Sequence, residues 1–230
     1  MAEKILILGG TKEASQLASD LVAIHGNEAV ISSLAGRTKE PKPVAGQVRI
    51  GGFGGVEGLT RFLVAEGISE VVDATHPFAK QISANAVEAC RQAGIALDVR
   101  TRQPWKRQPN DIWIEVKSLQ EARQQIPANA IVLLAIGAQH LGAFQGLTHA
   151  TLVARTVDGP TSKQENMVDA WIVGRPSIDV DEEARLLKDQ HITHIVCRNS
   201  GGKGAYAKIA AARRLGIPII IVQHPTVPHL

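Results

Sequence analysis

Short apolar runs alternate with amphipathic stretches along the chain, and this order predicts strands and helices in turn. The run Lys4–Leu8 is apolar after its first residue and is followed by two glycines, which is typical of a buried parallel strand. Apolar residues then recur at helical spacing from Thr11 to Leu21. Further strand patterns occupy residues 29–33, 47–50, 70–73 and 96–99, with helix patterns at 56–66 and 78–93. This β-α-β order predicts a parallel sheet covered by helices on both faces.

The pattern restarts after an aperiodic stretch at 101–111 that contains prolines and basic residues. Strand patterns follow at 112–116, 131–136, 151–154, 170–173, 194–197 and 217–222, with helix patterns at 119–125, 181–190 and 203–215. We therefore predict an α/β chain of two Rossmann-like domains, residues 1–100 and 101–230, with mainly parallel sheets and a cleft between the domains. A single continuous sheet is the alternative.

The amino-acid composition limits the kinds of molecule that the protein is expected to bind. Only 3% of the residues are aromatic, which argues against nucleic-acid readers that stack bases on aromatic side chains. The net charge of +3 is too small to indicate duplex binding, but it suits an anionic small ligand. The first residues run directly into a strand, without the pattern of a signal peptide, and no apolar stretch reaches membrane-spanning length. We expect a cytoplasmic protein that binds neither nucleic acid nor membrane.

The turn after the first strand is a candidate cofactor site, formed by Gly9, Gly10, Thr11, Lys12 and Glu13. Glycines let a ligand approach the backbone, and the N-terminus of the following helix attracts phosphate. The third glycine of the G-x-G-x-x-G fingerprint is missing. The turn therefore fits either a dinucleotide site or a plain helix start with Thr11 as its cap.

Two further segments are candidate cofactor contacts. The segment after the second strand offers four polar or small positions without a carboxylate, namely Ser33, Gly36, Arg37 and Thr38. That set suits the 2′-phosphate of NADPH, and a solvated polar loop is the alternative. The loop 51–55 contains four glycines, and we expect Gly52 to lie against the cofactor unless the loop is a flexible connector.

The segment after the fourth strand is the candidate catalytic region. Ligands of open α/β sheets bind beyond the carboxyl ends of strands, which places Asp73, Thr75 and His76 near cofactor or substrate. We predict that Thr75 contacts the cofactor and that His76 donates a proton, with Asp73 orienting its ring. In the alternative, Asp73 or Thr75 caps a helix that Pro77 opens, and His76 is structural.

A second glycine-containing loop follows the strand at 194–197. Its sequence lacks the phosphate-loop spacing, and Gly204 stands where Ser or Thr would hold magnesium. We predict that the loop and the helix start after it bind carboxylates through Ser200, Gly201, Gly202, Lys203 and Lys208, with Arg102 and Arg107 as weaker candidates. We expect no metal site, because His191 and His194 lack a third ligand.

Together these segments resemble the precorrin-6A reductase family of cobalamin biosynthesis. The specific ones are Asp73-Ala-Thr-His-Pro-Phe-Ala79 and Ser33-Leu-Ala-Gly-Arg-Thr38. The first strand and turn, the loop 51–55, Arg102-Gln-Pro-Trp105, Asn199-Ser-Gly-Gly202 and residues 207–213 extend the resemblance over nearly the whole chain. The resemblance implies hydride transfer from a nicotinamide cofactor to one carbon–carbon double bond of an anionic, ring-contracted tetrapyrrole, without flavin or metal.

Alternatives exist within and outside this family. We expect NADPH as the cofactor, with NADH possible. A cobalt-precorrin-6A reductase that uses NADH is the alternative within the family, and a non-catalytic dinucleotide-binding module is the alternative outside it. A short-chain dehydrogenase is excluded, because Tyr206 is the sole tyrosine and Ala210 stands where its Tyr-x-x-x-Lys pair needs lysine. Transient contacts with neighbouring pathway enzymes are a further expectation.

Overall fold

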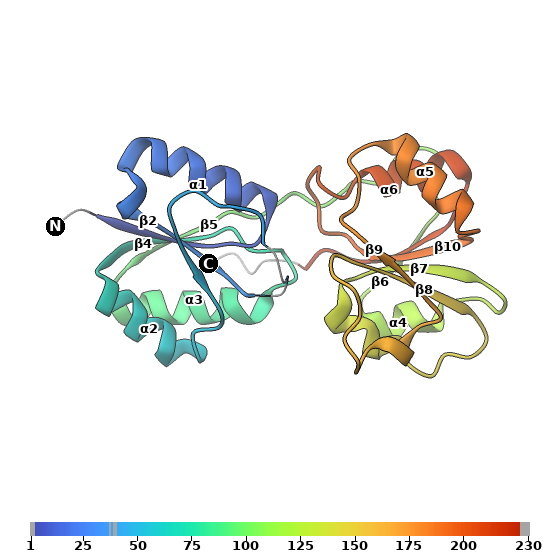
Figure 1. Ribbon diagram of the computed structural model, residues 1–230, viewed down its shortest axis with the longest axis horizontal. Helices are drawn as coiled ribbons and strands as arrows, with labels where there is room; N and C mark the ends of the chain where they lie inside the picture. The colour runs from blue at the N-terminus through green and yellow to red at the C-terminus, as the bar shows by residue number, and fades with distance from the viewer. Residues whose placement is uncertain (1–2, 37, 39–40, 226–230) are drawn as a thin grey trace. The chain divides into compact units, whose positions relative to one another are not determined.

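The chain divides into two compact units. The structure, a computed structural model, describes residues 3–36, 38 and 41–225. The units comprise Met1–Arg102 and Gln103–Leu230, whereas the sequence pattern placed the boundary after Arg100 (Figure 1). Each unit is an α/β fold on its own parallel sheet, so the predicted fold class is confirmed and the alternative of one continuous sheet is wrong.

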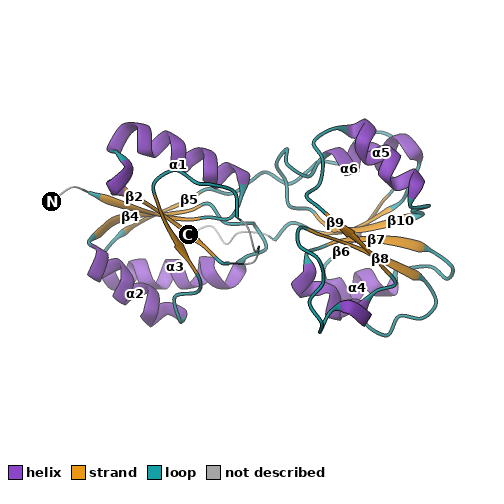
Figure 2. Cartoon of the chain, viewed as in Figure 1, coloured by secondary structure: helices purple, strands orange, loops and turns teal. Residues whose placement is uncertain are grey.

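The first unit has a five-stranded parallel sheet in the order β3-β2-β1-β4-β5. The strands are β1 (Lys4–Leu8), β2 (Val30–Leu34), β3 (Gln47–Ile50), β4 (Ile68–Asp73) and β5 (Ala96–Val99). Helix α1 (Lys12–His25) and the short 3-10 helix η1 (Asn27–Ala29) connect β1 to β2. Helix α1 covers one face of the sheet, and α2 (Gly55–Glu66) and α3 (Lys80–Ala93) cover the other (Figure 2).

Burial on both faces explains why β1 is apolar from Ile5 to Leu8. Ile5 and Ile7 pack with Ala14 and Ala18 of α1, whose small side chains let the helix lie close to the sheet. The alternate residues of β1 pack instead with the other helix layer, in a cluster that includes Leu59 of α2. Alternate side chains of a strand point to opposite faces, so a strand between two helix layers needs apolar residues at every position.

The second unit has a six-stranded parallel sheet in the order β6-β11-β10-β7-β8-β9. Its strands are β6 (Trp113–Val116), β7 (Ile131–Ala135), β8 (Thr151–Thr156), β9 (Ala170–Val173), β10 (His194–Arg198) and β11 (Ile219–Val222). Its helices are α4 (Leu119–Gln124), α5 (Val180–Asp189) and α6 (Ala207–Leu215), with the short turns η2 (Ala138–Phe144) and η3 (Glu165–Met167). Helices α5 and α6 lie together on one face, where they bury Leu187 and Ile209 against the sheet (Figure 1).

Two predicted helix starts are wrong. Helix α3 begins at Lys80, because Pro77 lies in a turn closed by a hydrogen bond from Ala79 N to His76 O at 2.7 Å. Helix α6 begins at Ala207 rather than Lys203, after a loop in which Gly201 and Gly202 have φ of +64° and +71°.

Within the described part of the chain, the helices are too short or too polar to cross a membrane.

Candidate cofactor and substrate sites

The strand order of the first sheet reverses between β1 and β4. The chain runs from β1 outward to β2 and β3, and from β4 outward to β5 on the other side. Ligands of parallel α/β sheets bind at such a reversal, beyond the carboxyl ends of the two strands. The segments that leave these ends are the glycine turn 9–13 and the segment 73–76. A hydrogen bond of 3.0 Å from Thr11 Oγ1 to Ala74 O joins them.

The glycine turn has the geometry of a phosphate site. Gly10 has φ of +98°, and a Cβ there would meet nothing within 4 Å in the described part of the chain, so the backbone is open to a ligand. Thr11 Oγ1 caps α1 by accepting from Ala14 N at 3.0 Å, which confirms the predicted cap. The first N–H groups of a helix lack partners within it, and α1 is long enough to favour an anion there. The turn fits a dinucleotide pyrophosphate.

Arg102 lies beside this turn rather than in the second unit. Its Nη2 is 2.7 Å from Oε2 of Glu13 in the first turn of α1, and its side chain is 17% exposed. Burial lowers the pKa of the Arg102 guanidinium, and the Glu13 carboxylate opposes that shift. The first unit ends at Arg102, two residues beyond the predicted boundary, and a contact of Arg102 with the substrate stays a prediction.

Asp73 and Thr75 are joined by two hydrogen bonds. Asp73 is 4% exposed, and its Oδ1 accepts from Thr75 N at 3.1 Å and from Thr75 Oγ1 at 2.7 Å. The N-cap position of α3 is Ala79, so the alternative in which Asp73 or Thr75 caps the helix is wrong. His76 Nδ1 accepts from Phe78 N at 3.3 Å, which places the proton of a neutral ring on Nε2.

Arg49 is a residue of this region that sequence reasoning missed. It lies on β3 and donates from Nη1 to Gly51 O at 2.6 Å and from Nη2 to Gly52 O at 2.7 Å. Its guanidinium lies 3.8 Å from the Phe53 ring centroid, and Nη1 is 3.4 Å from Ser33 Oγ on β2. Arg49 therefore ties the four-glycine loop to the sheet.

The other predicted contacts after β2 lie at the same edge. Ser33 is buried, and its carbonyl accepts from Gly9 N at 3.0 Å, which ties the ends of β1 and β2 together. Gly36 follows with φ of +70°, and a Cβ there would come 3.0 Å from a methyl carbon of Ile50. Arg37, predicted to pair with a 2′-phosphate, lies outside the described residues.

In the second unit, Trp105 fixes the loop that follows β10. Its backbone N donates to Asn199 Oδ1 at 2.7 Å, and Asn199 Nδ2 donates back to Trp105 O at 3.0 Å. The Trp105 indole Nε1 donates to Gly202 O at 2.7 Å. Ser200, which follows Asn199, is buried. The predicted binding loop therefore has a set shape, maintained by a residue nearly a hundred positions earlier in the chain.

Lys208 is not available to a ligand. It is 5% exposed, its Nζ donates to Ala205 O at 2.9 Å, and Nζ lies 5.0 Å from the Trp105 ring centroid. Burial lowers the pKa of its ammonium group. The prediction that Lys208 contacts substrate carboxylates is wrong, because the ammonium group is enclosed by its own loop.

The two remaining basic candidates have different surroundings. Lys203 is exposed on the loop, but the helix start expected beside it lies at Ala207. Arg107 donates from Nη2 to Asp111 O at 3.1 Å, which holds it within the segment that leads to β6. The contact of each residue with the substrate stays a prediction.

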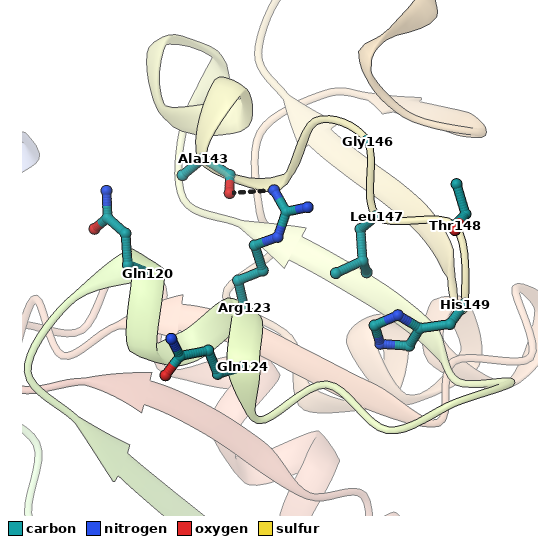
Figure 3. A pocket seen from close by; sticks show the side chains of 8 residues that line it. All are labelled: Gln120, Arg123, Gln124, Ala143, Gly146, Leu147, Thr148 and His149. Atoms are coloured by element: carbon teal, nitrogen blue, oxygen red, sulfur yellow. Dashed lines mark hydrogen bonds between the residues drawn. The ribbon is translucent and has the colours of Figure 1, made fainter.

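A separate hollow of about 480 Å³ lies beside α4 (Figure 3). Arg123 crosses it and donates from Nη1 to Ala143 O at 3.1 Å and to Gln145 O at 2.8 Å. The hollow is lined by Gln120, Arg123, Gln124, Ala143, Gly146, Leu147, Thr148 and His149, and the predicted site residues lie elsewhere. Among the described residues, no group of three or more His, Cys, Asp or Glu side chains could hold a metal ion.

Comparisons with known proteins agree on one family. The family model described as precorrin-6x reductase CbiJ/CobK matches residues 4–230. The precorrin-6A reductase of Rhodobacter capsulatus is 47% identical over 226 residues, which cover 98% of this chain and 89% of that protein. The solved structure of a CobK precorrin-6A reductase is 44% identical, with a TM-score of 0.92 over 99% of this chain and 90% of its own. The cobalt-precorrin-6A reductase of Methanothermobacter thermautotrophicus is 27% identical, over 97% of this chain and 77% of that protein.

Proposed function

The chain belongs to the precorrin-6x reductase family, and from that premise we propose that it reduces precorrin-6A with NADPH bound at the β1–β4 edge of the first unit. The family's reaction is an oxidation–reduction at a CH–CH group in cobalamin biosynthesis. One observation carries the assignment of the site. The bond from Thr11 Oγ1 to Ala74 O joins the phosphate-type turn after β1 to the segment with Asp73, Thr75 and His76 after β4.

Metal-free precorrin-6A is the preferred substrate in this proposal. The chain is 47% identical to a precorrin-6A reductase and 27% identical to a cobalt-precorrin-6A reductase, each compared over nearly the whole chain. The cobalt route with NADH is the second candidate.

Three groups of residues in the first unit fit a bound dinucleotide. The backbone of Gly9 and Gly10 and the start of α1 bind the pyrophosphate, and Arg102 neutralises Glu13 beside it. Ser33, Thr38 and Arg37 bind the 2′-phosphate, because no carboxylate in residues 32–38 favours an unphosphorylated ribose. Arg49 keeps Gly52 against the same edge. When bound, NADPH supplies the hydride.

His76 supplies the proton that accompanies the hydride. Its Nδ1 accepts from Phe78 N, so Nε2 carries the proton of the neutral ring. A histidine that carries its proton on Nε2 can act as a general acid from that atom. Asp73 acts through Thr75, which it binds through two hydrogen bonds, and it shapes the segment rather than reacting.

Anaerobic incubation of the purified protein with precorrin-6A tests the proposal. Reduced-nicotinamide absorbance should fall only when precorrin-6A is present, and faster with NADPH than with NADH. Parallel reactions with cobalt-precorrin-6A separate the two substrate candidates. Nucleotide binding without substrate-dependent oxidation would instead identify a non-catalytic dinucleotide-binding module.

A further inference from the structure

The hollow beside α4 has no part in the reaction proposed above. It lies between α4 and the segment 146–149, which leads into the amino end of β8. The predicted binding loop 199–202 instead follows the carboxyl end of β10. Strands β8, β7 and β10 run parallel in one sheet, so the hollow and the loop lie toward opposite ends of the strands. The hollow is therefore a separate feature of the second unit.

One wall of the hollow is α4. Gln120, Arg123 and Gln124 are spaced by three and four residues, which places them on one face of the helix. Ser118 caps the helix by accepting from Glu121 N at 3.1 Å, and the Glu121 carboxylate accepts from the backbone N before Ser118 at 2.8 Å. This reciprocal cap stabilises a short helix and so fixes the three side chains of the wall.

The opposite wall is the segment 146–149. His149 is tied at two points, because its Nε2 donates to Ile126 O at 3.1 Å and its carbonyl accepts from Asn129 N at 2.7 Å. A carbonyl can only accept, so Nε2 is the donor in the first of these bonds. Figure 3 shows this segment and α4 on the two sides of the hollow, with Arg123 reaching in between them. Both walls are therefore held by hydrogen bonds within the unit.

The guanidinium of Arg123 is anchored at one nitrogen and open along its other edge. Nη1 donates to Ala143 O at 3.1 Å and to Gln145 O at 2.8 Å, whereas Nε and Nη2 have no hydrogen-bond partner in the described part of the chain. The same edge binds a carboxylate elsewhere in this protein. Arg213 donates from Nε and Nη2 to the two carboxylate oxygens of Asp111, at 2.8 and 3.2 Å. Arg123 therefore presents an unfilled carboxylate fork in a fixed orientation.

The other lining groups suit the body of a small organic acid. Arg123 is the only arginine or lysine of the lining, which contains no carboxylate, and a single guanidinium matches a monocarboxylate better than a phosphate ester. The side chains of Gln120, Gln124 and Thr148 make no hydrogen bonds within the described residues and can bind hydroxyl groups, while Leu147 offers an apolar surface. The volume of about 480 Å³ is typical of small-molecule sites.

We propose that the hollow beside α4 binds a small hydroxylated monocarboxylate, whose carboxylate occupies the Nε–Nη2 fork of Arg123. The geometry that carries this proposal is the anchored guanidinium with its open edge between two fixed walls. The site is separate from the reductase reaction, so the proposal stands or fails independently of the proposed function.

Gluconate, a monocarboxylate with a hydroxylated chain, is the probe. Calorimetric titration into the purified protein at constant ionic strength, without nucleotide, should show binding at a single site. Sorbitol has the same carbon chain without the carboxylate and should bind about tenfold more weakly, the loss expected for a charge-assisted hydrogen bond. Inorganic phosphate should also bind more weakly than gluconate. Absence of gluconate binding would overturn the site, and sorbitol or phosphate binding at least as tightly as gluconate would overturn the carboxylate assignment.

Arg123→Lys locates the bound gluconate. The variant keeps the charge but loses the fork, so the affinity for gluconate should fall about tenfold. The matched control is Arg185→Lys, which makes the same change at an exposed position of α5 in the same unit and should keep the wild-type affinity. Wild-type affinity in a folded Arg123→Lys would show that gluconate binds elsewhere and would overturn the inference.

A second pair of variants leaves the anchor of Arg123 intact. Thr148 is exposed on the wall of the hollow, so substitutions there should fold normally. Thr148→Asp adds a carboxylate that repels the ligand and should weaken gluconate binding several-fold, whereas the neutral Thr148→Asn should stay close to the wild type. Thermal melting reports the folding of each variant. If Arg123→Lys does not fold, equal gluconate affinity in Thr148→Asp and Thr148→Asn would overturn the inference in its place.

Discussion

The hydroxyl of Thr11 donates to the carbonyl of Ala74 at 3.0 Å while it accepts from the backbone N of Ala14 at the same distance. One side chain therefore caps α1 and ties the end of β1 to the segment after β4. Serine, threonine and aspartate are all good caps, but the bond to Ala74 also needs a donor. This double use explains why a hydroxyl residue follows the two glycines.

Thr11→Val removes both bonds and keeps the shape of the side chain. We expect a stability loss of about 1–2 kcal/mol, seen as a lower melting temperature, because a helix cap is lost. We also expect a higher KM for NADPH, because the two ligand-binding segments are no longer joined. Thr11→Ser should restore both values. The control is Thr60→Val on α2, whose hydroxyl bonds to Val56 O away from the site and should not change the KM for NADPH.

Arg102→Ala should weaken cofactor binding rather than substrate binding. The variant leaves the Glu13 carboxylate uncompensated beside the start of α1, where it repels phosphate. Steady-state kinetics should show a KM for NADPH raised several-fold and an unchanged KM for precorrin-6A. The double variant Glu13→Gln/Arg102→Ala should return the KM for NADPH toward the wild-type value. An effect on the KM for precorrin-6A alone would support the original assignment of Arg102 to the substrate. Arg91→Ala, which breaks an exposed pair with Glu88, is the control.

The architecture could be predicted because local pattern and tertiary environment agree. Central strands such as β1, β7 and β11 are short, mainly apolar runs, and most of the glycines that follow strands and helices mark their ends in the sequence. The errors lie at two helix starts, where the turn at Pro77 and the loop with Gly201 and Gly202 stand in place of a first helical turn. Residues 203–206 have a helix-compatible sequence, but Gly201 and Gly202 turn the backbone the other way and delay α6 to Ala207.

The site could be predicted only where its residues are close in sequence. The glycine turn and the segment 73–76 each carry their own motif. Residues far apart in the chain meet where their strands are neighbours, which only the strand order reveals. Arg49 was missed for the same reason, since its contact with Ser33 depends on the pairing of β3 with β2. Lys208 was misassigned because charged residues are normally exposed, and its burial over Trp105 has no local signal.

His76→Asn tests the assignment of the proton donor. If His76 is the general acid, kcat should fall by about 10²–10⁴-fold, with little change in the KM for NADPH. The pH profile of kcat should also lose the limb that the imidazole contributes. His25→Asn, at the last turn of α1, is the control and should keep the wild-type profile. Near-normal turnover of His76→Asn at every pH would point to solvent as the proton source.

Lys208 should make stability depend on pH. Burial lowers the pKa of its ammonium below the ordinary value of 10.5, so in the window between the folded pKa and 10.5 the unfolded chain binds more protons than the folded chain. Stability should therefore rise with pH in that window. Lys208→Met keeps the apolar stem and should melt with a weaker rise than the wild type. Lys188→Met, an exposed position at the end of α5, should keep the wild-type dependence. An identical dependence in Lys208→Met would contradict the assignment.

Arg37 and Arg49 should affect cofactor use in different ways. If Arg37 pairs with the 2′-phosphate, Arg37→Ala should reduce kcat/KM with NADPH by about 1.5–3 kcal/mol and leave NADH almost unaffected. Arg49 holds Gly51 O and Gly52 O, so Arg49→Gln should loosen the loop and reduce kcat/KM with both cofactors by similar factors. Arg61→Ala, an exposed cation on α2, is the control for lost charge. Equal losses with both cofactors in Arg37→Ala would remove it from the 2′-phosphate site, and a loss confined to NADPH in Arg49→Gln would place Arg49 there instead.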